Sequence, residues 1–214
     1  MSVFKQRLEV LKNRIEKACV KVGRDPKEVN LLPISKKKSI LDIKEAVSLG
    51  FNRFGENNVQ EALIKFEQAK NLNLNWCIVG HLQTNKAKYV ARFVKEVHSL
   101  DRLSLARELH KHLDKEGRAL DVLIQVNTSG EPQKSGVAPD QALAFAKELS
   151  KLNSLRVKGL MTIAVQSDEE AKVKACFSSL RDLRELLLQD SPLESLETLS
   201  MGMSKDLELS LIHI

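Results

Sequence analysis

The sequence has few aromatic residues. Only 4% of its 214 residues are aromatic, with one Trp and one Tyr. Proteins that bind nucleic acid usually stack bases on aromatic side chains and gather basic residues on one face. Here the net charge is +6, but Lys and Arg are spread through the chain beside Asp and Glu. We therefore expect no nucleic-acid partner, and the positive charge favours a small phosphate-bearing ligand.

Cysteines are also few, and the three that occur are far apart. Cys19, Cys77 and Cys176 form no C-x-x-C arrangement. An odd number of separated cysteines is typical of a reducing compartment and predicts neither a disulfide framework nor a zinc site. We expect a cytoplasmic protein without a bound metal.

Long apolar runs are absent as well. No stretch of the sequence approaches the ~20 residues that a membrane-spanning helix needs. Residues 1–9 mix charged with apolar side chains, whereas a signal peptide has an uninterrupted apolar centre. We therefore expect no membrane partner.

Two phosphate-binding motifs of nucleotide enzymes are missing. The chain has no G-x-G-x-x-G after its first apolar segment and no G-x-x-x-x-G-K-[ST]. Instead, short apolar segments alternate with amphipathic helical ones, which predicts a parallel α/β fold. A TIM-type (β/α) barrel, one unit short of eight, fits this alternation best. The segments expected to be strands are residues 31–35, 54–57, 76–80, 97–100, 120–126, 157–163 and 198–201.

Lys36 stands at the end of the first of these segments. The apolar run 31–35 is followed by three lysines and then by Ser39, which can cap a helix with Asp42 as its partner. In parallel βα units, ligands gather at the carboxyl ends of the strands. Partial desolvation by the strand favours the neutral amine, the nucleophile that forms a Schiff base. A solvated basic loop is the alternative interpretation of the same residues.

Polar residues follow the other predicted strands too. If the strands close into a barrel, these groups face one mouth. A glycine-containing turn before a helix starting at Ser204 could offer N–H groups to a phosphate, and Lys36 an amine to a carbonyl carbon. The pattern predicts a pocket for a phosphorylated carbonyl compound. The residues are Glu56 with Asn57, Gly80 with His81, Asn127, Met161 with Thr162, and the segment 200–204.

Several polar residues also have plain structural interpretations. We expect Glu56 to cap a helix or to pair with a neighbouring lysine, and Lys134 to face the solvent from its loop. We expect His81 and His98 to be structural rather than acid–base groups.

Longer motifs add a resemblance to a known family. Over about residues 5–208, the chain resembles the pyridoxal phosphate homeostasis protein family. The motifs that carry the resemblance are Ser35-Lys36, Phe54-Gly55-Glu56-Asn57-Asn58-Val59-Gln60-Glu61, Gly80-His81-Leu82-Gln83-Thr84-Asn85-Lys86, Leu123-Ile124-Gln125-Val126-Asn127-Thr128-Ser129, Lys134-Ser135-Gly136, Gly159-Leu160-Met161 and Leu199-Ser200-Met201-Gly202-Met203-Ser204.

The resemblance implies a single barrel like the N-terminal domain of alanine racemase. It also implies that pyridoxal 5′-phosphate is bound as a Schiff base to Lys36, and that Asn57 lines the pocket. The segment that includes Ser200, Met201, Gly202 and Ser204 is expected at the cofactor phosphate. The implied role is intracellular homeostasis of this vitamin B6 cofactor, without an established catalytic activity, and we expect a monomer.

The sequence departs from the family pattern at two places. The usual Ser-Lys-Thr-Lys-Pro around the lysine reads Ser-Lys-Lys-Lys-Ser at residues 35–39, so a second amine stands close by. Family members continue into an eighth strand with an Arg-x-Gly-[Ser/Thr] segment, which the tail 209–214 does not resemble. We therefore expect residues 1–214 to form one C-terminally truncated barrel domain without its eighth strand.

An amino-acid racemase-like enzyme that uses the same cofactor is the alternative function. Such an enzyme needs an acid–base group on the opposite face of the cofactor. In alanine racemases we would expect a tyrosine from a second domain, whereas the only tyrosine here, Tyr89, lies in the middle of a predicted helix. The sequence therefore favours a cofactor-binding protein with no catalytic residue.

Overall fold

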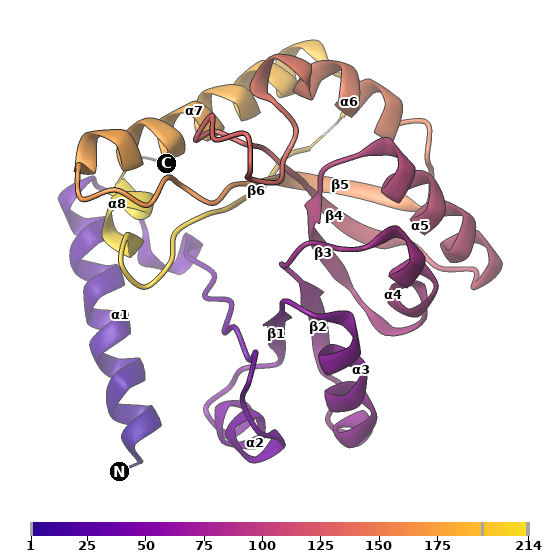
Figure 1. Cartoon of the computed structure of the whole chain (residues 1–214). Helices are drawn as coiled ribbons and strands as arrows, with labels where there is room; N and C mark the ends of the chain where they lie inside the picture. The colour runs from indigo at the N-terminus through magenta and orange to yellow at the C-terminus, as the bar shows by residue number, and fades with distance from the viewer. Residues whose placement is uncertain (1, 194, 213–214) are drawn as a thin grey trace.

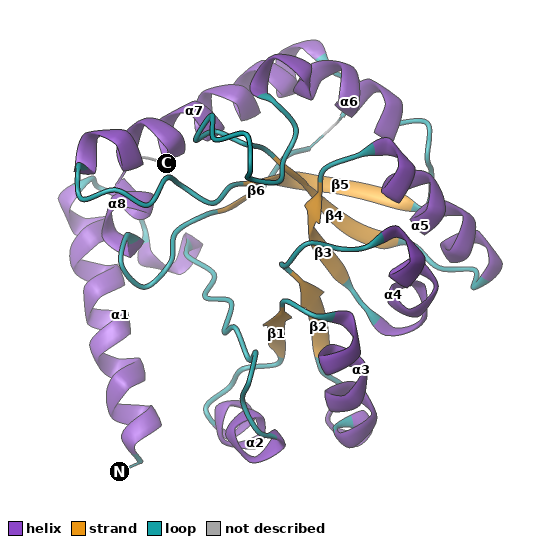
Figure 2. Ribbon diagram, viewed as in Figure 1, coloured by secondary structure: helices purple, strands orange, loops and turns teal. Residues whose placement is uncertain are grey.

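The computed structural model describes residues 2–193 and 195–212. They contain one sheet of six parallel strands in the order β1-β2-β3-β4-β5-β6. The sheet curls, and helices α2 to α7 lie around its outer side, which gives an open (β/α) barrel (Figure 1, Figure 2). The predicted TIM-type fold class is confirmed.

Strands and helices alternate along most of the chain. Among the described residues, no helix combines the length and the apolar character required to span a bilayer. The strands are β1 (Arg53–Glu56), β2 (Asn75–Ile78), β3 (Glu96–Leu100), β4 (Leu120–Gln125), β5 (Leu155–Met161) and β6 (Thr198–Ser200). The α-helices are α1 (Val3–Lys21), α2 (Ile40–Ser48), α3 (Val59–Gln68), α4 (Ala87–Phe93), α5 (Leu103–Lys115), α6 (Ala142–Leu149), α7 (Glu170–Asp190) and α8 (Leu207–Ile212).

The first predicted strand, residues 31–35, does not form a full strand. It makes a single parallel bridge, between Ile34 and Gly55. The Gly55 N–H donates to Pro33 O at 2.8 Å, and the Ser35 N–H donates to Gly55 O at 2.9 Å. Proline has no N–H to donate, so the ladder cannot continue through Pro33. The other six predicted strands form at or within a few residues of their expected positions.

Two helix starts flank the predicted site. Ser39 and Asp42 form the expected capping box at the start of α2. Helix α3 is capped by Asn58, whose Oδ1 accepts the Gln60 N–H at 2.8 Å. Asn57 therefore precedes the helix and stands at the rim of the barrel.

Helix α8 begins at Leu207 rather than at Ser204. The Met203 N–H donates to the Asp206 carboxylate, and the Asp206 N–H donates to Met203 O at 3.2 Å, which holds this segment as a turn. Of the tail 209–214, residues 209–212 belong to α8, and residues 213 and 214 lie outside the described part of the chain.

Side chains alternate between the two faces of the sheet. Trp76 and Ile78 of β2 and Val97 of β3 are buried in the apolar core between sheet and helices. The alternate residues Cys77 and His98 point the other way, into the barrel. The helices thus cover an apolar face, and the barrel interior carries polar groups.

Strands β5 and β6 approach each other closely at Gly159. A Cβ at this position would lie 1.8 Å from the Thr198 carbonyl oxygen, so only glycine fits there. The resulting register pairs Met161 with Ser200. This pairing brings the end of β6 to the same rim as the end of β5.

A chain of hydrogen bonds links β1, β3 and β6 across the barrel interior. The Arg53 guanidinium donates twice to Glu96, once from Nε at 2.7 Å. The His98 ring joins Glu96 to β6, with Nε2 3.1 Å from Glu96 Oε2 and Nδ1 2.9 Å from Ser200 Oγ. His98 therefore holds the Ser200 side chain, and its expected lack of an acid–base role stays a prediction.

The contacts within this hydrogen-bond network determine the protonation states of Glu96 and His98. Burial alone would raise the pKa of Glu96, but hydrogen bonds from His98 and Arg53 outweigh burial and lower this pKa from 4.5 to about 2. Burial lowers the pKa of His98 below its usual 6.5. Near neutral pH, Glu96 is ionised and His98 is neutral. The His98 Nε2–H is then donated to Glu96, and Nδ1 accepts the hydroxyl hydrogen of Ser200.

Glu96→Gln should destabilise the protein near neutral pH and progressively less in acid. The pKa of Glu96 is lower in the folded state, so its carboxylate contributes stability that is fully present above pH 4.5 and is lost as the pH falls towards about 2. Discounting the shift for partial exposure, we expect a loss of about 2 kcal/mol in unfolding free energy near pH 6. Urea unfolding at about pH 6 and about pH 3 measures the difference.

A matched control is Asp121→Asn, which removes a carboxylate that accepts a hydrogen bond from the exposed Arg156. Exposed pairs contribute little, so this variant should lose less stability at either pH. A loss for Glu96→Gln that does not change with pH would contradict the assignment.

Candidate functional site

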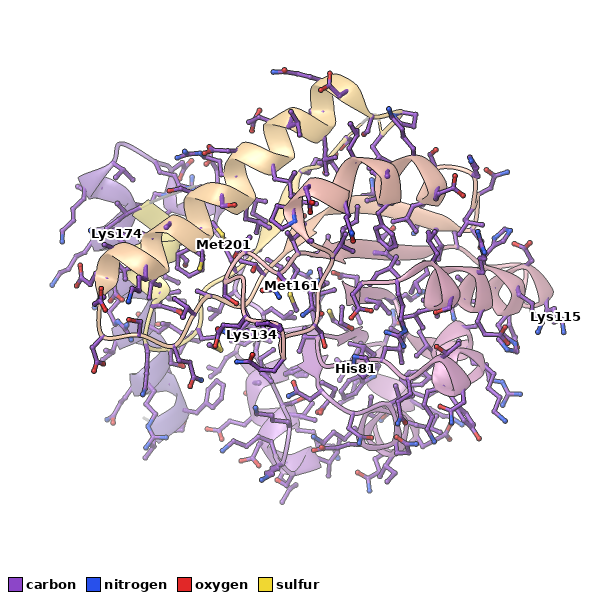
Figure 3. All side chains as sticks on the ribbon, turned by 45° about the horizontal axis from the view of Figure 1, so that its top comes forward. His81, Lys115, Lys134, Met161, Lys174 and Met201 are labelled. Atoms are coloured by element: carbon purple, nitrogen blue, oxygen red, sulfur yellow. The ribbon has the colours of Figure 1, made fainter. Side chains whose placement is uncertain are left out.

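A cavity of about 720 Å³ opens at the carboxyl ends of the strands. Its lining combines apolar side chains with an amine, amides, hydroxyls and imidazoles. In Figure 3, Lys134 and Met161, which line the cavity, lie over the middle of the molecule, whereas Lys115 and Lys174 project from its periphery. The polar side chains of the lining include Lys36, Asn57, His81, His98, Gln125, Asn127, Lys134, Ser135, Thr162 and Ser200.

Five of the six predicted cofactor-binding residues come together in this lining. They are Lys36, Asn57, Ser200, Met201 and Gly202. Ser204 does not line the cavity; it is exposed, and its carbonyl oxygen accepts a hydrogen bond from Arg14 at 3.2 Å. The segment from Ser200 to Gly202 thus faces the cavity, and the chain leaves the rim before Ser204.

Lys36 and the two alternate residues before it, Leu32 and Ile34, all line the cavity, as the strand periodicity predicts. The side chain between them, Ser35, is buried on the other side. Lys36 itself is exposed, so the expected desolvation by the strand is wrong. The reason is the single bridge at Ile34, which leaves this segment at the open edge of the sheet.

The backbone around Lys36 rests on a buried ionic network. Glu56 is fully buried and Lys65 is 5% exposed. The Lys65 ammonium donates to Glu56 Oε1 at 2.6 Å and to Glu61 Oε1 at 2.7 Å. The predicted pairing of Glu56 with a lysine is confirmed. The four-residue spacing of Glu61 and Lys65 on a helix predicts an ion pair between them, but the ion pair of Lys65 with Glu56 depends on how the helix packs on β1.

The loop 128–137 brings Lys134 to the cavity. The Lys134 ammonium donates to Ala164 O at 3.0 Å and pairs with Glu131 at 2.5 Å. The Asn127 side chain donates to Glu131 O at 2.9 Å, which anchors the base of the loop. The expectation that Lys134 faces the solvent is therefore wrong, because these two acceptors hold its side chain at the cavity wall.

The turn after β6 depends on Gly202. Its φ is +87°, and a Cβ at this position would lie 2.2 Å from Ser210 Oγ. Glycine therefore allows the chain to reverse against α8. The reversal keeps Met201 and Gly202 in the cavity lining.

One cluster has donor atoms of metal-binding type. Among the described residues, Cys77, Glu96 and His98 place one such atom each within 4.8 Å of one another. The Glu96 carboxylate already accepts hydrogen bonds from Arg53. Burial raises the pKa of Cys77 well above its usual 9.0, which keeps the thiol protonated. We assign this cluster to the barrel interior, and the expected absence of a metal stays a prediction.

The chain is similar to a known family over nearly its whole length. The family described as "Alanine racemase, N-terminal domain" matches residues 7–213. The chain is 41% identical to the pyridoxal phosphate homeostasis protein of Pseudomonas aeruginosa, over 99% of this chain and 90% of that protein. It is 33% identical to the protein of the same name from Escherichia coli, over 99% of this chain and 91% of that protein.

Solved structures agree with the sequence relatives. PipY of Synechococcus elongatus, solved with PLP bound, superposes with a TM-score of 0.82 at 33% identity, over 94% of this chain and 93% of PipY. Alanine racemase of Streptomyces coelicolor has a TM-score of 0.72 at 16% identity, over 96% of this chain and 55% of the racemase, which shows the shared fold. The chain therefore belongs to the pyridoxal phosphate homeostasis protein family, whose fold is that of the alanine racemase N-terminal domain.

Proposed function

We propose that this chain binds pyridoxal 5′-phosphate in the cavity at the barrel rim and acts in the intracellular homeostasis of this cofactor. We further propose that Lys36 holds the cofactor as a Schiff base. The observation that carries the proposal is that Lys36 and the segment from Ser200 to Gly202 line the same cavity. The names of the relatives and the PLP-bound PipY support it.

The residues present fit the chemistry of this cofactor. The cavity of about 720 Å³ lies within the usual range for small-ligand sites. Bound pyridoxal 5′-phosphate supplies an aldehyde that condenses with an amine. The Lys36 Nζ would attack the aldehyde carbon, and a C=N bond would form as the carbonyl oxygen leaves with two amine hydrogens as water.

The other end of the cofactor needs hydrogen-bond donors for its phosphate. The Ser200 hydroxyl is already donated to His98, and the Thr162 hydroxyl donates to Val126 O at 2.9 Å. We propose that the backbone N–H groups of Met201 and Gly202 hold the phosphate, because the Met203 N–H is already donated to Asp206, and that the Lys134 ammonium adds positive charge. Cys19, Cys77 and Cys176 are buried and unpaired, which suits a reducing cytoplasm.

We propose no efficient catalysis by the bound cofactor. His98 lines the cavity, but its two ring nitrogens are engaged by Ser200 and Glu96, and Tyr89 lies on α4 outside the cavity lining. His81 at the rim is exposed, with Nδ1 4.0 Å from Asp101, and it is the group that a racemase-like alternative would have to use.

Lys36→Ala should abolish the covalent link. Borohydride reduces a Schiff base to a stable amine, so protein incubated with pyridoxal 5′-phosphate and then reduced should carry the label on the peptide that contains Lys36. Mass spectrometry of the digested protein measures the label. Lys37→Ala and Lys38→Ala are the controls and should keep it. A label that persists on Lys37 or Lys38 in Lys36→Ala would contradict the assignment.

Gly202→Val should weaken the binding of pyridoxal 5′-phosphate about tenfold or more, because a displaced turn loses its hydrogen bonds to the phosphate. The binding of unphosphorylated pyridoxal should change much less. Titrations that follow absorbance give both dissociation constants. Gly117→Val is the control, because Gly117 has a φ of +60° and open space around it at the end of α5. Equal losses for the two ligands in Gly202→Val would show that the turn acts only through folding.

The protein loaded with cofactor should give no multiple-turnover racemisation, transamination or decarboxylation of L-alanine, other amino acids or their keto acids. The physical reason is the lack of a positioned acid–base group opposite Lys36 in the proposed site. Chiral chromatography of the reaction mixture measures turnover. Reproducible turnover that disappears in both Lys36→Ala and His81→Gln would move the protein to the racemase-like alternative.

A further inference from the structure

We infer that the buried Glu56 and Lys65, together with the partly exposed Glu61, form a clamp that fixes the backbone on both sides of Lys36, and that Lys65 is a positioning residue for the Lys36 side chain. This inference rests on the proposed function of Lys36. It assigns a role to a buried lysine that does not itself line the cavity.

The clamp holds the peptide that precedes Lys36. The Lys65 ammonium donates to Ser35 O at 2.5 Å, and the Ser35 hydroxyl donates to Glu56 Oε1 at 2.6 Å. The carbonyl and the side chain of Ser35 are thus bound to the two members of one buried ion pair. The Lys65 ammonium has three hydrogens and three acceptors, at Ser35, Glu56 and Glu61, so its orientation is fully determined.

The clamp also holds the peptide that follows Lys36. The Lys37 N–H donates to Glu61 Oε1 at 2.6 Å, and this is the same oxygen that accepts from Lys65. Lys37 has a φ of +60°, a left-handed conformation that residues other than glycine rarely adopt. A sharp local conformation of this kind persists only where the surroundings impose it, and the Glu61 carboxylate supplies that constraint.

Strand pairing alone does not fix the backbone at Lys36. The segment 31–35 makes one bridge to β1, through Ile34, and the ladder ends before Lys36. Lys36 itself is exposed at the cavity. The direction of its Cα–Cβ bond is therefore set by its two neighbours, Ser35 and Lys37, and both are bound to the clamp.

Stability is a weak explanation for these buried charges. A buried ion pair costs desolvation, and an apolar replacement of similar volume is often as stable or more so. The second oxygen of Glu56, Oε2, is buried and has no hydrogen-bond partner among the described residues, so the network is not fully satisfied. Directional control of a neighbouring reactive group accounts for the charges, because a misplacement of about 1 Å is enough to slow a reaction substantially.

The test compares two ligands of the same cavity. Pyridoxal 5′-phosphate has an aldehyde and can react with Lys36, whereas pyridoxine 5′-phosphate carries an alcohol at that carbon and can only bind. In Lys65→Met, the rate of borohydride-trappable link formation on Lys36 should fall about tenfold or more, while the dissociation constant of pyridoxine 5′-phosphate changes less than about twofold. Lys70→Met, which removes an exposed partner of Glu67 just after α3, is the matched control and should change neither.

A second pair of variants keeps the inference testable if Lys65→Met does not fold. Glu61 is partly exposed, and Glu61→Gln retains an oxygen for the Lys37 N–H, whereas Glu61→Ala removes it. Link formation should slow in Glu61→Ala and recover substantially in Glu61→Gln.

The outcomes separate the clamp from the proposed function. Parallel losses for both ligands, or an unchanged rate in Lys65→Met and Glu61→Ala, would overturn the clamp and leave the role of Lys36 intact. Absence of any trapped link in the unmodified protein would overturn the proposed Schiff base, and the clamp with it.

Discussion

Parallel pairing between consecutive strands is the constraint on which the site depends. From β1 to β6 every strand runs in the same direction as its neighbours, so all carboxyl ends lie at one rim of the curled sheet (Figure 2). The register then decides which side chains meet there, as in the pairing of Met161 with Ser200. A slip of one residue would turn Ser200 towards the helices, because the side chains of a strand alternate between the faces. Backbone hydrogen bonds therefore determine the composition of the cavity wall before any ligand contributes.

Within that frame, two ionic networks orient the groups on opposite sides of the cavity. Arg53, Glu96 and His98 direct the Ser200 hydroxyl, and the clamp of Glu56, Lys65 and Glu61 directs the backbone beside Lys36. Each network has one end among buried groups and the other end at the cavity wall. Removing one member of such a pair is costly, whereas replacing the whole pair by apolar residues is often neutral, so stability alone does not require charged groups here. What charged groups add is hydrogen bonds with fixed directions, and both networks direct these bonds to the cavity wall.

The sequence predicted the architecture well, because periodicity and strand–helix alternation are local signals. Strand β4 is a nearly continuous apolar run, and the Ser39 capping box follows directly from residue spacing. The first predicted strand was wrong because the missing N–H of Pro33 ended its pairing. Lys134 was misplaced because its acceptor, the carbonyl of Ala164, lies thirty residues away in the chain. Contacts of that kind depend on register and loop path, which a single sequence does not encode locally.

Ser200 shows how a local prediction changes once its neighbours are known. The segment that includes Ser200 is expected at a phosphate, but ionised Glu96 accepts the Nε2–H hydrogen bond of His98, and His98 Nδ1 in turn accepts the hydroxyl hydrogen bond of Ser200. The oxygen that Ser200 presents to the cavity can therefore accept a hydrogen bond but has no hydrogen left to donate. Under the proposed function, a phosphate at this turn would depend on backbone N–H groups and on positive charge, and Ser200 would orient any ligand atom that carries a hydrogen. The tautomer of His98, inside the barrel, would then determine which ligand atoms can hydrogen-bond to Ser200 at this end of the cavity.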